Sequence, residues 1–474
     1  MEFVYAIIAL TIAILLFVIP AVIGILFWKR GQPIPLSLLS VTVINNVMQV
    51  TVPTVYGVFM DFPIERSLGL SPANIVQVLF LHLIYYILFV FVFLNRLPLL
   101  RKDNAGALHW QIDSFTLKIF LVLGLWQRLT TLDVSGLGGY QANEQVILRG
   151  QYSPPELVSI YLNTMFGWTT LACSAILFVD KETSRYWRLL SAATLLLYVL
   201  RQTALGLRGG VFIVGVLLAF LTIAYGRTRG VLYFFLAVAI IAPVFTMLGS
   251  SYRIDVQQFL VRANTFERLA YIAKSLASSQ SSREDDILLE NLMVRLQATR
   301  HSVALIRLYD NGKGAGLKPM TSALAAVVPG WLWPSKPYPT SSTDDASGSA
   351  MYVSVKETNG RSDMGPYLTS AHAYWEGGII WLIACGLATG WLWNQIVKWS
   401  YRRKDGIVLL VLVMLLDAHH GEMEVLAPIP SIIRLFWYSI LPVLLFVYAV
   451  EGVRIAAKNL NNLLLDNGKA TDPT

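Results

Sequence analysis

About eleven long, mostly apolar stretches run through this chain, each near the 20 residues that an α-helix needs to cross a lipid bilayer. Charged residues make up 14% of the chain, whereas soluble domains carry about 25%. With so few charged residues, most of the surface of this chain cannot lie in water. The net charge of +8 does not change this conclusion. The sequence predicts an all-α polytopic membrane protein. It excludes a soluble enzyme, a nucleic-acid-binding protein and a disordered scaffold.

The predicted spans are separated by short connections, with one exception between spans 8 and 9. They cover residues 3–28, 35–60, 75–95, 114–132, 156–179, 187–206, 209–226, 230–249, 375–397, 406–424 and 429–450. The second span is the weakest, because Asn45, Asn46 and Gln49 interrupt it. An amide without a partner is costly in hydrocarbon, so we expect these side chains to face the helix bundle.

Lys and Arg concentrate in alternate connections, which by the positive-inside rule are cytoplasmic. With about eleven spans, all the basic connections lie on one side, the N-terminus is periplasmic and the C-terminus is cytoplasmic. The first span has no basic residues ahead of it, so we expect a retained helix and not a cleaved signal peptide. The predicted organisation has four parts: spans 1 to 8 in 1–249, a large extracytoplasmic loop in 250–371, spans 9 to 11 in 372–452, and a cytoplasmic tail in 453–474.

The long extracytoplasmic loop is nearly neutral, with 13 Lys+Arg against 11 Asp+Glu over 250–371. Loops of this length in a compact protein are usually functional. Its first half has a helical pattern: Ser281 and Glu284 fit a capping box, and an apolar stripe follows as far as Ile306. Its second half is irregular and contains Trp331 and Trp333, which either stack on sugar rings or anchor the loop in the membrane interface.

Arginines gather at the predicted outer ends of the spans, although the short outer loops are otherwise poor in basic residues. They are Arg128, Arg201, Arg208, Arg253 and Arg434. Guanidinium groups at one depth suit a diphosphate, whose oxygens accept paired hydrogen bonds. The alternative is that each side chain extends separately to lipid headgroups. Arg208 is the strongest candidate, because the glycines around it expose backbone N–H groups near a helix N-terminus.

A second group of polar residues opens the ninth span. His372 and Glu376 are four residues apart and would share one helix face at the outer membrane surface. A histidine there could accept a proton from an acceptor hydroxyl; alternatively, it only forms a hydrogen bond with its neighbour. Side chains of the types that bind metal ions also occur where span 10 ends, at Asp417, His419 and Glu422. Their spacing matches no defined metal-binding motif, so no metal site is predicted.

The order and side of these features resemble the bacterial O-antigen and exopolysaccharide repeat-unit polymerases. The features are an arginine-glycine turn at Arg208, a large outer loop, a Trp-Pro-Ser-Lys-Pro run from Trp333, and a return helix with Ala-Tyr after His372. The resemblance covers roughly 200 to 381. It implies a GT-C-like fold shared with the O-antigen ligases, and an enzyme of the bacterial inner membrane.

The resemblance also implies a mechanism. A polyprenyl-diphosphate-linked glycan would be the donor, and a second lipid-linked repeat unit would be the acceptor, with inversion at the anomeric carbon. His372 and Glu376 would act at the acceptor hydroxyl, and Arg208 would hold the departing diphosphate. Further substrate contacts are expected from the outer arginines, from Trp331 and Trp333, and from Arg295, Arg300, Lys336 and Arg361. No metal or other cofactor is expected, and the partners are lipid-linked glycans, membrane lipids and a protein that regulates chain length.

Two alternatives stay open. Many polymerases carry Glu at the position of His372, whereas the ligases place His there in a His-Asn context that this chain lacks, so a ligase is not separated from a polymerase. A transporter of lipid-linked oligosaccharides would also need a cationic outer pocket, but we expect it to have inverted repeats and helices broken at the membrane midplane, and we see neither. A cysteine-dependent transpeptidase is disfavoured, because Cys173 and Cys385 both lie inside apolar runs.

Overall fold

The structure is a computed structural model of the whole chain. It describes residues 2–30, 46–60, 71–95, 114–130, 169–204, 208–225, 298–318, 367–403 and 440–469, with isolated positions between them. All the regular elements in these ranges are helical. They are α1 (Glu2–Lys29), η1 (Val47–Thr51), α3 (Val52–Phe59), α5 (Pro72–Leu94), α6 (Ser114–Thr130), α9 (Arg185–Ala204), α10 (Arg208–Ala224), α14 (Ala298–Asp310), α17 (Thr369–Arg403) and α20 (Leu441–Lys469).

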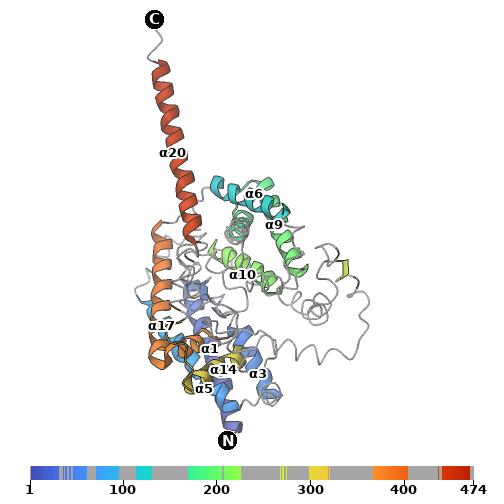
Figure 1. The fold of residues 1–474 in the computed structure, drawn as a ribbon, viewed down its shortest axis with the longest axis vertical. Helices are drawn as coiled ribbons and strands as arrows, with labels where there is room; N and C mark the ends of the chain where they lie inside the picture. The colour runs from blue at the N-terminus through green and yellow to red at the C-terminus, as the bar shows by residue number, and fades with distance from the viewer. Residues whose placement is uncertain are drawn as a thin grey trace.

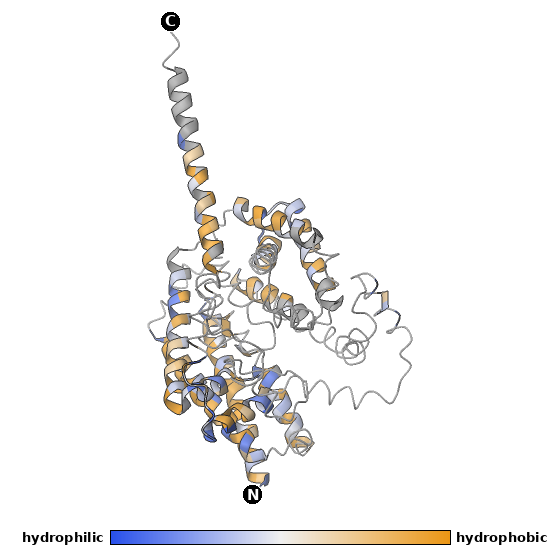
Figure 2. Cartoon of the chain, in the orientation of Figure 1, coloured by the Kyte–Doolittle hydropathy of each residue, from blue (hydrophilic) through white to orange (hydrophobic). Residues whose placement is uncertain are grey.

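Three of the described helices are long and apolar enough to cross a membrane: Glu2–Lys29, Pro72–Leu94 and Thr369–Trp399. Two shorter helices, Phe115–Trp126 and Thr169–Val179, are also apolar. Figure 2 shows predominantly hydrophobic residues along α1, α5 and the first part of α20. The prediction of a helical membrane protein is therefore confirmed, and the three long helices match the predicted spans 1, 3 and 9. Predicted spans 8 and 10 lie outside the described residues.

Among the described helices, α5 and α17 make the most extensive contact, and they run parallel. His82 of α5 lies 3.2 Å from the hydroxyl of Ser370, at the start of α17. Further along both helices, Asn394 donates a hydrogen bond of 2.7 Å to the carbonyl of Phe93. Because residue numbers rise together along this contact, the two helices run in the same direction. This direction agrees with their predicted places as spans 3 and 9, both of which start on the outer side.

Two glycines allow the backbones of α5 and α17 to approach closely. A Cβ atom on Gly386 would lie 3.1 Å from the carbonyl oxygen of Tyr85, and one on Gly390 would meet the backbone of Phe89. The four-residue spacing places both glycines on one face of α17. One turn later, Asn394 donates to the carbonyls that end α5, including that of Asn95 at 2.8 Å. Small residues and one capping amide therefore fix this pair.

The second predicted span contains a π-helical turn, η1, that packs against α1. Asn46 and Gln49 are 2% and 3% exposed, as predicted for amides that face the bundle. Asn46 donates a hydrogen bond of 3.1 Å to the carbonyl of Leu16, inside α1. Asn45, the third amide of this prediction, lies outside the described residues.

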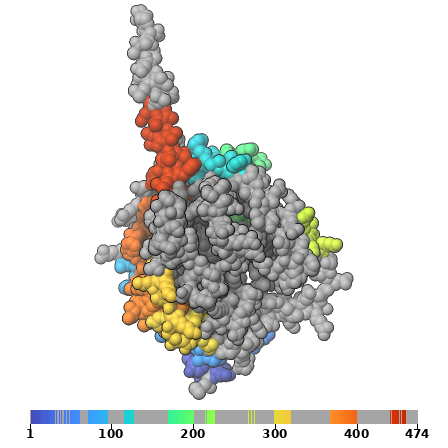
Figure 3. All heavy atoms as spheres, viewed as in Figure 1, coloured from blue at the N-terminus to red at the C-terminus, as the bar shows by residue number. Residues whose placement is uncertain are grey.

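Helix α14 lies in the segment predicted as a long loop, but it is buried against α17 and α5. All its residues from Ala298 to Ile306 are buried, so the helix has no broad solvated face. The sequence predicts one apolar stripe in this region, and the near-complete burial shows that the other sides of the helix are covered as well. Figure 1 shows α14 at the end of the molecule where the N-terminus lies, and Figure 3 shows the surface of this segment (yellow) beside α17 (orange).

Two helices differ from the predictions in their extent. Helix α17 begins at Thr369 and is broken at Gly377 and Gly378, whose backbone angles are not helical. The sequence does not predict this break, which lies near the predicted outer end of span 9. Helix α20 continues to Lys469, through most of the segment predicted as a tail, and projects away from the other helices (Figure 1).

Candidate functional site

The candidate site lies where the first two turns of α17 meet α14 and α5. The Ser302 hydroxyl of α14 donates to the carbonyl of Ala298 at 2.7 Å and accepts the backbone N–H of Leu368 at 2.9 Å. Ser370 contacts His82 of α5. All of these side chains are buried, and buried polar groups hold a fixed geometry only when they are bonded to one another. The start of α17 is therefore anchored on both neighbouring helices.

His372 and Glu376 face each other one turn apart, as the sequence predicts. The Nδ1 atom of His372 lies 3.4 Å from the Oε1 atom of Glu376, which is close enough for electrostatic attraction and longer than a good hydrogen bond. The two residues are 4% and 5% exposed. The imidazole is stacked on Tyr367, with ring centroids 5.7 Å apart, and meets the edge of Trp375 at the same distance. The histidine is held between two aromatic rings and one carboxylate.

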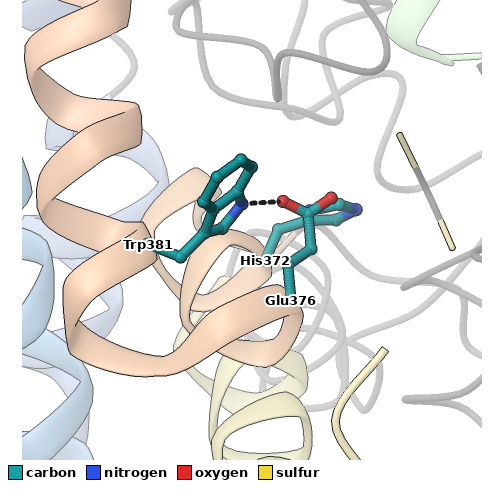
Figure 4. A network of polar contacts seen from close by, with 3 residues as sticks. All are labelled: His372, Glu376 and Trp381. Carbon is teal, nitrogen blue, oxygen red and sulfur yellow. Dashed lines mark hydrogen bonds and ion pairs between the residues drawn. The ribbon is translucent and has the colours of Figure 1, made fainter. Parts of the chain in front are cut away.

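The second oxygen of the Glu376 carboxylate accepts a hydrogen bond from a residue that follows the helix break. The Nε1–H of Trp381 donates to Oε2 of Glu376 at 2.6 Å. Figure 4 shows the indole folded back over the carboxylate, with His372 beside the carboxylate's other oxygen. The three side chains form one chain of polar contacts: Trp381 to Glu376 to His372.

A second polar cluster ties the same three helices together nearer the surface. Asp310, at the end of α14, accepts the hydroxyl of Tyr374 at 3.0 Å and the side-chain amide of Gln77 at 3.4 Å. Arg307 donates to Asn74 of α5 at 2.9 Å. Asp310 and Gln77 are exposed, so this cluster lies at the surface of the junction.

The structure places the predicted arginines in three groups. Arg300 lies on α14, where its side chain is 3% exposed, so it is part of the buried junction. Arg208 is the first residue of α10, while Arg128 and Arg201 lie in the last turns of α6 and α9; their side chains are outside the described residues. The other predicted substrate-binding residues lie outside the described ranges altogether: Arg253, Arg295, Arg361, Arg434, Lys336, Trp331 and Trp333.

Three residues of the site were missed in the sequence. His82 carried a signal, because a histidine inside an apolar span is a functional candidate by default. Ser302 and Trp381 carried none, because a serine and a tryptophan are ordinary in membrane helices. What brings them to the site is the docking of α14 for Ser302 and the break in α17 for Trp381.

Within the described residues, no group of three or more His, Cys, Asp or Glu side chains is arranged to hold a metal ion. The Asp417, His419 and Glu422 group lies outside them. Cys173 and Cys385 are both buried and free of disulfides. A buried thiol in apolar surroundings is a poor nucleophile, so neither cysteine is a candidate for the chemistry of this region.

A carboxylate on Nδ1 of a histidine favours the tautomer that carries its proton on Nδ1, which leaves Nε2 as the basic atom. This arrangement can accept a proton from a hydroxyl group without a metal ion.

Comparison with protein-family models, with curated proteins and with solved structures finds no significant match. Functional inference therefore rests on the site geometry and on the motifs of the sequence.

Proposed function

We propose that this protein joins lipid-diphosphate-linked oligosaccharide repeat units into a polysaccharide on the extracytoplasmic face of the bacterial inner membrane. The observation that supports this function best is the buried His372–Glu376 pair, at the predicted outer end of a membrane helix. A proton acceptor at this depth suits a substrate whose lipid anchor lies in the membrane and whose sugar lies just outside it.

The reaction proposed is an inverting glycosyl transfer. The acceptor hydroxyl loses its proton to Nε2 of His372 while its oxygen forms a bond to the anomeric carbon of the donor. The bond from that carbon to the diphosphate oxygen breaks on the opposite face, and its electron pair leaves with the diphosphate. Glu376 stabilises the imidazolium that forms, since an adjacent carboxylate favours the protonated ring. Arg208 and other outer arginines are assigned to the negative charge on the departing diphosphate.

One alternative is a transporter for the same lipid-linked substrate, because discontinuous helices are typical of transporter substrate sites near the membrane midplane. The break in α17, at Gly377 and Gly378, lies instead near the predicted outer end of its span. A transporter would move the lipid-linked repeat and form no glycosidic bond. Measuring bond formation by the purified protein distinguishes the two functions.

The test compares the wild type and three variants of the purified, detergent-extracted protein, with a lipid-diphosphate-linked repeat unit as the only substrate. We expect His372→Gln to lower the rate of polymer formation on the order of 100- to 10,000-fold, the usual contribution of a general base. Glu376→Gln should lower it at least about tenfold, because the amide cannot stabilise an imidazolium. The control is Glu182→Gln, which removes an exposed carboxylate before α9 and should leave the rate unchanged.

Each alternative has its own outcome. If the wild type forms no polymer but moves the substrate across vesicle membranes, the protein is a transporter. If it forms a bond only when a lipid A-type acceptor is supplied, it is a ligase. A rate for His372→Gln equal to that of the wild type would remove the histidine from the reaction.

A further inference from the structure

The contact between Trp381 and Glu376 depends on the break in α17. Residues five positions apart in a continuous α-helix are about 140° apart around its axis and lie on different faces. Gly377 has φ −157° and ψ 23°, and Gly378 has φ 69° and ψ −158°. These angles turn the second half of the helix, so the indole returns to the carboxylate that precedes the break (Figure 4).

The break is specified by α14 as well as by the two glycines. The backbone angles of Gly378 lie in a region that is accessible essentially only to glycine. A Cβ atom at this position would collide with the phenol ring of Tyr309, which α14 places against the break. Tyr309 also meets Tyr374 edge-to-face, with ring centroids 4.9 Å apart. The loop helix therefore holds α17 in the conformation that brings Trp381 to Glu376.

The two oxygens of Glu376 consequently have different partners. Oε2 accepts the indole N–H at 2.6 Å, a short bond of the charge-assisted kind. Oε1 remains directed at Nδ1 of His372, at 3.4 Å. A carboxylate held by one oxygen can rotate little, so the position of the other oxygen is fixed.

We propose that Trp381 is a positioning residue for the reaction, acting on His372 through Glu376. This inference rests on the proposed function. The indole holds the carboxylate at Nδ1, the carboxylate fixes the imidazole tautomer, and Nε2 is thereby presented to the acceptor hydroxyl. Trp381 itself touches neither substrate in this role, so its loss should lower kcat and leave KM nearly unchanged.

The test replaces the indole N–H and keeps an aromatic ring. Trp381→Phe should lower kcat on the order of 10- to 100-fold, as expected when a hydrogen bond to a charged group is lost. The control is Trp391→Phe on the same helix; Trp391 is 58% exposed, and its replacement should leave kcat unchanged. If Trp381→Phe does not give monodisperse protein, benzothienylalanine at this position keeps the two-ring shape and replaces the N–H with sulfur.

A double-mutant cycle separates positioning from a purely structural role. If Trp381 acts only through Glu376, then Trp381→Phe should lower kcat no further when Glu376→Gln is already present. Losses that multiply in the double variant would overturn the inference. So would a wild-type kcat for Trp381→Phe beside a strongly impaired Glu376→Gln, an outcome that leaves the proposed function standing. If His372→Gln and Glu376→Gln are both fully active, the proposed site fails and the inference fails with it.

Discussion

Arg208 is the first residue of α10, where the backbone N–H groups of a helix begin and an anion is favoured. If its guanidinium binds a diphosphate through paired hydrogen bonds, an ammonium group cannot replace it. We therefore expect Arg208→Lys to insert normally and to lose polymer formation on the order of 100-fold. The measurement is polymer yield per unit of monodisperse protein.

Arg185 provides the matched control for this prediction, because it is the first residue of α9, is exposed, and lies at the predicted cytoplasmic side. Arg185→Lys should keep the wild-type yield. Equal yields from Arg208→Lys and wild type would mean that Arg208 only reaches lipid headgroups, and would shift the diphosphate role to Arg253, Arg295 or Arg361.

At the residue scale, the sequence predicted the contacts that depend only on helix periodicity. His372 and Glu376 are four apart, so any helix through them brings them together. The contact of Trp381 with Glu376 could not be predicted in this way, because it depends on the backbone angles of two glycines. Glycine is common in membrane helices, and its presence does not reveal whether the helix continues or breaks.

At the scale of elements, the α5–α17 pair gives a stability prediction. A methyl group on Gly390 would meet the backbone of Phe89, which cannot move as a flexible side chain can. We expect Gly390→Ala to lower the free energy of unfolding by about 1–3 kcal/mol, the usual cost of overpacking. Thermal unfolding of the detergent-extracted protein measures the loss.

The same substitution at Gly452 is the control, because a Cβ atom there has no neighbour within 4 Å. Gly452 lies within α20, where alanine favours the helix by about 0.5–1 kcal/mol relative to glycine. Gly452→Ala should therefore be neutral or slightly stabilising. Equal effects at the two positions would mean that the α5–α17 contact at Gly390 is loose enough to accept a methyl group.

For the whole molecule, sidedness is the property on which the proposed function depends. Asn311, after α14, and Asn459, in α20, are both exposed, and Figure 1 places α14 and the far end of α20 at opposite ends of the molecule. A membrane-impermeant maleimide should label Asn311→Cys in intact spheroplasts, and should label Asn459→Cys only after permeabilisation. The native Cys173 and Cys385 are buried, so background labelling should be low. Labelling of Asn459→Cys alone in intact spheroplasts would place the site on the cytoplasmic face and contradict the proposed function.

The sequence by itself determined that this is a helical membrane protein, where its long apolar helices lie, and which pair of ionisable residues opens α17. These properties follow from composition and periodicity, which a chain carries wherever its segments end up in space. Tertiary structure decided that α14, in the segment predicted as a long loop, is buried, that His82 meets Ser370, and that Trp381 returns to Glu376. Those contacts join residues far apart in the chain or across a broken helix, so they depend on packing that no local pattern encodes.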